Sequence, residues 1–187
     1  MANFFSAGLI SITRRLFPDL AVEALHYTGA QWGFLVMTVA VTRTTVFAIM
    51  ERYHGWVYRP KRLLLIQALF PLGCLLIIFA KSYWVFVLAF ASIGAACGVV
   101  YFSSLYYSVH GAGSQAHRAG MHESVLGLGA GVIPFFAGRT RELARPYWRN
   151  AIRAPYVLGT VLALTSIAIQ LAMFARSCRV RRTEGAP

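Results

Sequence analysis

LLLIQALFPLGCLLIIFA at positions 63–80 and YWVFVLAFASIGAACGVVYFSSLYYS at positions 83–108 are two long apolar stretches joined only by Lys81 and Ser82. A helix rises about 1.5 Å per residue, so about 20 apolar residues cross the roughly 30 Å hydrocarbon layer of a membrane. A helix on the surface of a soluble domain needs only one apolar face. This stretch therefore predicts two consecutive membrane-spanning helices.

The same pattern continues on both sides of this pair. Six apolar segments can be drawn over the chain, at positions 2–17, 31–50, 63–80, 83–108, 120–138 and 155–175. The second to sixth are long enough to span. We predict an all-α membrane protein, a six-helix bundle in one transmembrane domain over residues 1–187. Residues 176–187 follow as a basic tail.

The first segment is shorter than the others. Its apolar part runs only from Ala2 to Thr13, before two arginines at positions 14 and 15. We expect either an interfacial helix or a spanning helix that has lost its beginning. Pro18 and Asp19 should end it, and residues 20–30 should form a loop.

Composition supports a membrane protein. Hydrophobic residues make up 58% and charged residues 13% of the chain, and the mean hydropathy is +0.59. A soluble domain carries about twice this charged fraction. The net charge of +12 is explained by loop residues that anchor helix ends and meet anionic lipid head groups. We therefore expect membrane lipids as partners, and no nucleic acid.

No catalytic or metal-binding pattern is found. Cys74, Cys97 and Cys178 share no CxxC spacing, and the histidines at 110, 117 and 122 fit no compact metal motif. The chain has only six acidic residues, so carboxylate pairs have few candidates. We expect no enzyme, no cofactor and no metal.

Loop charges leave the orientation open. Arginines and lysines divide into nine on one side, at 52, 59, 61, 62, 118, 176, 179, 181 and 182, and eight on the other, at 14, 15, 81, 139, 141, 145, 149 and 153. Four of the latter recur every fourth residue from Arg141 to Arg153, so a helix there would carry them on one face. Such a segment would lie on lipid head groups or bind an acidic partner.

Two glycine pairs predict close helix packing. Gly94 and Gly98 form a GxxxG pattern on the fourth segment, and Gly127 and Gly131 form another on the fifth, before Pro134. Small residues one turn apart let helix backbones approach closely in lipid. The second pattern is compatible with packing alone or with a hinge that flexes during transport.

Among the residues of the predicted spans, Arg43 costs the most free energy to place in the membrane. It lies within the second segment, and such a charge usually faces the bundle interior or water on a functional path. The alternative is that its side chain extends to the nearer helix end, roughly 10 Å away.

Polar residues also gather where the fourth and fifth segments meet. Tyr101, Ser104 and Ser108 share one helical face and would line a wet cavity or belong to an interfacial aromatic belt. His122 and Glu123 open the fifth segment, where they cap the helix or take part in proton coupling or substrate contact.

Three features together resemble the major facilitator superfamily of secondary transporters. The opening at positions 3–18 looks like the family's seventh helix joined mid-span, and Gly127, Gly131 and Pro134 resemble its glycine-proline pattern. The third feature is its loop motif, at Glu51-Arg52-Tyr53-His54-Gly55 with Arg59, Lys61 and Arg62. The motif here has one extra residue before the glycine and lacks the upstream glycine.

The resemblance covers the whole chain as helices seven to twelve, the first one truncated, in two three-helix units of inverted topology. It implies a plasma (inner) membrane location with a cytoplasmic C-terminal tail, first and fourth segments facing a central cavity, and third and sixth facing lipid. It assigns as substrate-binding residues Asn3, Ser6, Arg43, Tyr101 and Ser104. It assigns as gating or coupling residues Arg43, Glu51, Arg52, Glu123, Gly131 and Pro134.

Two functions follow. The first is half of a secondary transporter that moves a small solute by alternating access and needs a second six-helix half, because the family transports between two halves. In that case Glu51 would interact with a residue of the other half. The alternative is a non-transporting membrane subunit or scaffold of a larger complex.

Overall fold

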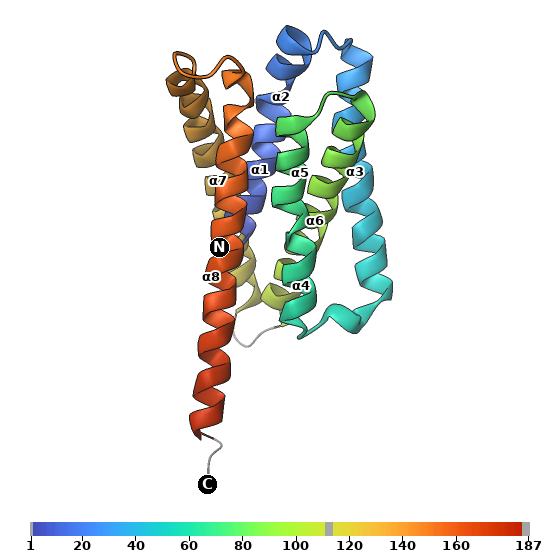
Figure 1. The fold of residues 1–187 in the computed structure, drawn as a ribbon. Coiled ribbons are helices and arrows are strands. Elements are labelled where there is room, and N and C mark those ends of the chain that lie inside the picture. Colours follow the sequence, from blue (N-terminus) through green and yellow to red (C-terminus); the bar gives the residue numbers. More distant parts are fainter. Residues whose placement is uncertain (1, 111–113, 185–187) are drawn as a thin grey trace.

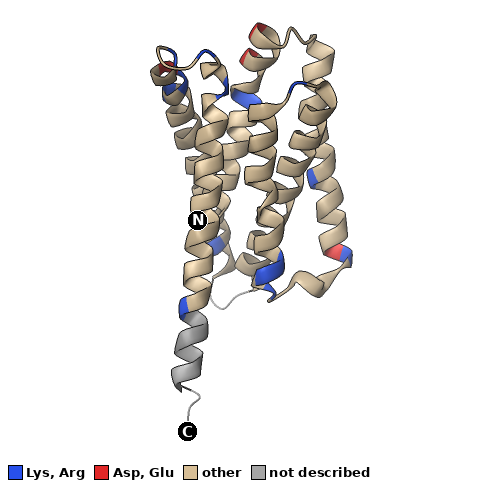
Figure 2. Ribbon diagram, in the orientation of Figure 1, with Lys and Arg blue, Asp and Glu red and all other residues tan. Residues whose placement is uncertain are grey.

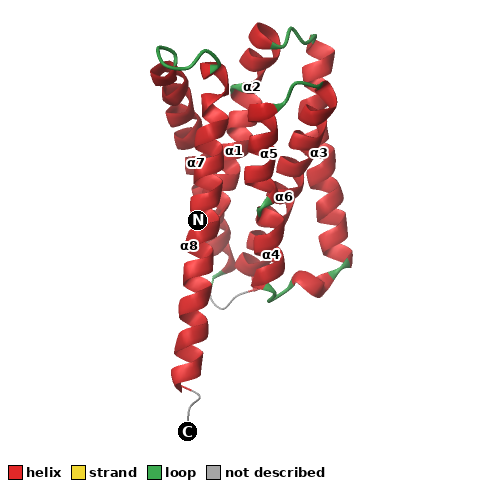
Figure 3. Cartoon of the chain, viewed as in Figure 1, coloured by secondary structure: helices red, strands yellow, loops and turns green. Residues whose placement is uncertain are grey.

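The protein folds into a bundle of helices that run along one common axis (Figure 1). The computed structural model describes residues 2–110 and 114–184, with side chains described as far as Arg176. Helices are the only regular secondary structure in these ranges (Figure 3). The prediction of an all-α protein is confirmed.

The bounds of the helices follow the predicted order. They are α1 (Ala2–Arg15), α2 (Phe17–Asp19), a π-helical turn (Leu20–Ala24), α3 (Gly29–Arg52), a 3-10 turn (His54–Trp56), α4 (Pro60–Gln67), α5 (Leu69–Phe79), α6 (Tyr83–His110), α7 (Gln115–Ala144), a second 3-10 turn (Ala151–Arg153) and α8 (Ala154–Glu184). Most of the predicted basic tail therefore continues α8 as a helix, and residues 185–187 lie outside the described range.

The segment after α1 is more helical than predicted. Pro18 lies in the first turn of α2, where its missing N–H costs nothing, and the π-helical turn follows directly. Thr28 then starts α3 with a capping box, in which Gln31 N donates to Thr28 Oγ1 at 3.3 Å and Thr28 N donates to Gln31 Oε1 at 2.8 Å. The predicted loop over residues 20–30 is wrong except at residues 25–28.

The third predicted segment consists of two helices instead of one. α4 and α5 meet at Ala68, three residues before Pro71. Proline has no N–H to donate to the carbonyl four residues earlier, which here belongs to Gln67. The helical ladder is therefore interrupted at this point, inside the span.

Four stretches of the described chain are long and apolar enough to cross a membrane, namely Gly29–Arg52, Pro60–Phe79, Tyr83–His110 and Ala151–Arg176. They agree with a multi-pass membrane protein. Five complete spans were expected, and α7 is the one that does not qualify. It is long enough, but Glu123 and Arg139 bound a short apolar part that is rich in glycine.

α6 is the most buried of the four spans, and two helix pairs build the bundle around it. α1 packs along α7, and α3 packs along α6. Phe17, the first residue of α2, packs against α6, because its ring lies 4.6 Å from that of Phe90 and 5.7 Å from that of Phe86. All three rings are fully buried.

The first glycine pair makes the predicted close contact. A Cβ on Gly94 would lie 2.7 Å from the carbonyl oxygen of Val39, and one on Gly98 would lie 2.9 Å from Val46 Cγ1. Gly94 and Gly98 thus let the backbones of α3 and α6 approach.

The second glycine pair does not pack inside the chain, which corrects the prediction. A Cβ on Gly127 or Gly131 would meet nothing within 4 Å, whereas one on Gly129 would collide with the backbone of Phe4 on α1. A helix turns about 100° per residue, so Gly129 lies on nearly the opposite face from its glycine neighbours. The pattern identified the right helix and the wrong face.

Charged residues gather at the two ends of the bundle (Figure 2). The predicted arginine face does not form, because α7 ends at Ala144. Arg141 pairs with Asp19 and, at 2.8 Å, with Glu23, while Arg153 donates to the Ile78 carbonyl at 2.6 Å. These two arginines therefore link neighbouring segments at the end of the bundle where α7 connects to α8.

Candidate functional site

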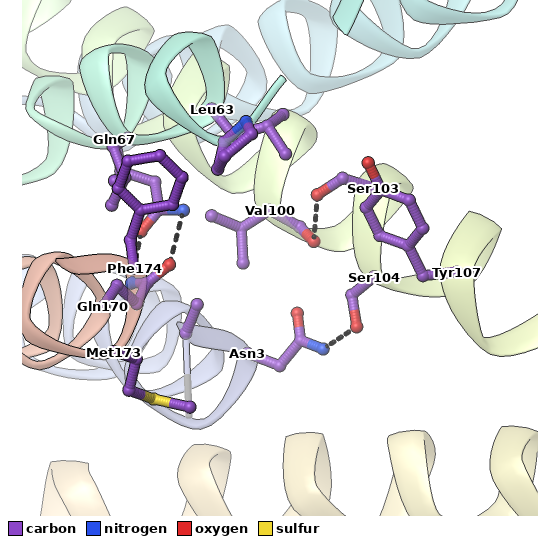
Figure 4. A pocket seen from close by; sticks show the side chains of 13 residues that line it. Asn3, Leu63, Gln67, Val100, Ser103, Ser104, Tyr107, Gln170, Met173 and Phe174 are labelled. Carbon is purple, nitrogen blue, oxygen red and sulfur yellow. Dashed lines mark hydrogen bonds between the residues drawn. The ribbon is translucent and has the colours of Figure 1, made fainter. Parts of the chain in front are cut away.

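The predicted polar residues line two pockets to which both α1 and α6 contribute. The first, which we call the amide pocket, has a volume of about 580 Å³ between α1, α4, α6 and α8, and its polar lining consists of Asn3, Gln67, Ser103, Ser104, Tyr107 and Gln170 (Figure 4). The second, the arginine pocket, has about 270 Å³ between α1, α3, α6 and α7, and its polar lining consists of Ser6, Ser11, Arg14, Arg43, Cys97 and Tyr101. The expected cavity residues are thus divided between two sites.

The first turn of α1 lines the amide pocket through Ala2 and Asn3. α1 begins part way along the bundle axis (Figure 1). Asn3 Nδ2 donates to Ser104 Oγ, and the two side chains point toward each other in Figure 4. The other amide atom, Asn3 Oδ1, is buried and has no hydrogen-bond partner. A buried acceptor of this kind is costly unless a donor meets it.

Two glutamines form the opposite wall of the amide pocket (Figure 4). Gln170 Nε2 donates to Gln67 Oε1 at 2.8 Å, and Gln67 Nε2 donates back to Gln170 Oε1 at 3.2 Å. Gln170 Nε2 also lies 3.2 Å from Ser166 Oγ. This pair joins α8 to the end of α4, next to the break at Ala68.

Arg43 points into the second pocket with its guanidinium over two aromatic rings. Its Cζ lies 4.6 Å from the ring centroid of Tyr101 and 5.2 Å from that of Phe47. The rings supply a cation–π attraction but accept no conventional hydrogen bond. Nε of Arg43 is buried without a hydrogen-bond partner, and no carboxylate of the described residues pairs with Arg43.

Tyr101 links this pocket to the polar start of α7. Its hydroxyl lies 3.4 Å from Glu123 Oε1, and the same oxygen lies 3.3 Å from His122 Nδ1. His122 Nε2 is buried without a partner. α7 begins at Gln115 with Ser114 as its cap, so the expected capping role of His122 and Glu123 is wrong and they lie two turns inside the helix.

Ser6 also lines the arginine pocket, and its hydroxyl donates to Cys97 Sγ at 3.3 Å. The predicted residues not yet described lie outside both pockets. Glu51 and Arg52 are exposed at the end of α3, and within the described part of the chain neither forms an ion pair. Pro134 is buried within α7, and Gly131 lines an exposed groove on that helix. The structure therefore does not bring the expected gating residues together.

Several pocket residues were missed from the sequence, among them Gln67, Gln170 and Arg14. Gln67 and Gln170 are amides inside apolar segments, which is a signal for an interhelical hydrogen bond in lipid. Arg14 was counted as a loop charge, because position in the chain does not show that it lines the same pocket as Arg43.

No three metal-binding side chains gather anywhere in the described residues. Comparison of the chain with known protein families, with curated proteins and with solved structures found no match.

Proposed function

We propose that the chain is one six-helix half of a secondary transporter that moves a small solute by alternating access. The arginine pocket forms part of the solute path. The observation that carries the proposal is Arg43, a cation inside a membrane span that faces a pocket and has no carboxylate partner among the described residues. The sequence resemblance to the major facilitator superfamily supports it.

Arg43 lies nine residues before Arg52, which is about 14 Å from the end of α3. A charged residue at the centre of a span costs about 2.5–3.5 kcal/mol to insert. Two aromatic rings offset part of this cost. A charge kept at this depth without a partner is explained by water or a solute that reaches it.

In this proposal the second half packs against α7, where the arginine pocket and an exposed apolar groove share a lining residue. Gly127 lines this pocket and also an exposed apolar groove formed by Leu128, Gly131, Val132, Phe135 and Phe136. A partner that covers the groove would also close the pocket. In this proposal the protein lies in the plasma (inner) membrane with its C-terminus in the cytoplasm.

The same groove favours a second candidate function. Exposed aromatic and glycine residues on one helix face also suit a membrane subunit that joins a larger complex without transporting anything. The two functions differ in what the arginine pocket does after assembly.

The test begins with the protein in mild detergent after extraction from its membrane. Native mass spectrometry should find it bound to a second helical half or to another copy. The complex, reconstituted in liposomes, should then take up a small solute with saturation. A strictly monomeric protein would overturn the transport proposal, and a stable complex that takes up none of a broad panel of solutes would favour the scaffold.

A further inference from the structure

We propose that the arginine pocket binds an anion, and that the solute carries one carboxylate or phosphate group held by Arg43 and Arg14. Only the statement that this anion is the transported solute rests on the proposed function. Binding itself belongs to the chain alone and is tested on it.

The lining of the arginine pocket carries two positive charges. Arg14, near the end of α1, and Arg43, on α3, contribute to one pocket of about 270 Å³, and none of its described lining residues is acidic. Neither arginine forms an ion pair with a described carboxylate. Arg43 is half-buried and Arg14 is exposed, so solvent screens part of the repulsion between these like charges, and an anion bound by both would remove the rest.

The nearest carboxylate does not fill this role. Glu123 reaches the hydroxyl of Tyr101, not the guanidinium of Arg43, and its side chain is 62% exposed. The Arg43 Nε atom remains buried without an acceptor. A carboxylate or phosphate accepts two parallel hydrogen bonds from a guanidinium, which an ammonium does not offer in the same geometry.

The rest of the pocket sets the size of the ligand. Ile10, Leu126 and Ala130 form an apolar side, and the hydroxyls of Ser6 and Ser11 lie among the lining. Its volume is close to the lower end for small-molecule sites, which is roughly 300 Å³. The fit is therefore to a small organic anion with a short apolar part.

An anionic lipid head group offers the same chemistry as a soluble anion. We commit to the soluble anion because the pocket has hydroxyl groups and limited volume. The experiment therefore uses discs of two lipid compositions, one of phosphatidylcholine alone and one that includes phosphatidylglycerol.

The probe is radiolabelled benzoate, added to the full chain in these nanodiscs. We expect saturable binding in phosphatidylcholine, competition by inorganic phosphate, and none by benzyl alcohol or benzylamine, which match benzoate in size. Arg43→Gln and Arg14→Gln should each weaken binding at least tenfold. Arg15→Gln should change it less than twofold, because Arg15 is exposed like Arg14 but does not line the pocket.

Three results would overturn the proposal: no saturable benzoate binding by the wild-type chain, equal competition by benzylamine, or full binding by both glutamine variants. Loss of benzoate binding in discs with phosphatidylglycerol would show that a lipid head group occupies the pocket. That result would overturn the proposal of a soluble anion. The competition series uses the wild-type chain, so it stands even where a variant does not fold. Binding without uptake by any assembled complex would overturn the transport function and leave this inference intact.

Discussion

Single residues carry most of what is unusual in this bundle. Arg43, Asn3 and His122 each hold a buried polar atom without a hydrogen-bond partner, and each lies in or beside one of the two pockets. Buried polar groups in proteins are nearly always satisfied. The Tyr156 hydroxyl, which lines neither pocket, is unsatisfied as well. Of these residues, Arg43 is the one whose replacement tests function and stability separately.

Replacement of Arg43 by leucine should abolish uptake and leave membrane insertion unchanged. The change removes the cation that α3 contributes to the lining of the pocket. The loss should cost about 2 kcal/mol or more of the free energy of solute binding, which weakens the affinity at least about thirtyfold. Insertion becomes easier, because a charge leaves the span. Arg43→Lys should also fail if a planar bidentate contact is used.

The measurement is initial uptake by the assembled complex, with membrane levels followed by immunoblotting. Thr44→Val is the matched control, since Thr44 is the exposed neighbour of Arg43. Full uptake by Arg43→Leu would mean that the arginine only extends to the helix end.

At the scale of helices, the pair α1 and α7 and the pair α3 and α6 are both made close by glycine. The proposed two inverted three-helix units would relate one pair to the other. Gly129 lies against the backbone of Phe4 in one pair, and Gly94 against that of Val39 in the other. Close backbone approach is thus the main packing device of both pairs.

Gly129→Ala should destabilise the bundle, whereas Gly131→Ala should not. A Cβ at position 129 collides with backbone, which cannot give way as a flexible side chain would, and such overpacking costs about 1–3 kcal/mol. A Cβ at position 131 meets nothing within 4 Å, and alanine favours the helix by up to about 1 kcal/mol. Thermal unfolding in detergent, followed by circular dichroism at 222 nm, compares the two. Equal melting temperatures would contradict the contact between α1 and α7.

The Gln67–Gln170 pair should behave as a coupled unit between α4 and α8. Gln170→Leu leaves the amide of Gln67 unsatisfied and should lower the free energy of unfolding by about 1 kcal/mol. The double variant Gln67→Leu/Gln170→Leu removes both polar groups and should recover most of the loss. Unfolding titrations in mixed micelles give the coupling energy. Additive losses in the double variant would show that the two amides act independently.

Across the whole molecule, local properties were predictable and spatial ones were not. Hydropathy located the helices because the cost of burying backbone and charge in lipid is set residue by residue. The break at Ala68 was also visible in the sequence, in Pro71, although we predicted one helix. The contact face of α7 and the pocket that Arg14 shares with Arg43 depend on how helices rotate about their axes, which hydropathy does not fix.

The α7 groove should be required for assembly but not for the stability of the chain. Gly131 is exposed and a Cβ added there meets nothing within 4 Å, so Gly131→Leu should leave the melting temperature of the isolated bundle unchanged. A partner helix that packs on this face needs small residues for close approach, so the same change should reduce the fraction of complex in native mass spectrometry by about tenfold. Ala172→Leu makes the same type of change on the exposed face of α8, outside the groove, and should leave assembly intact. If both variants assemble like the wild type, the partner does not cover α7, and the arginine pocket has to be closed by another element.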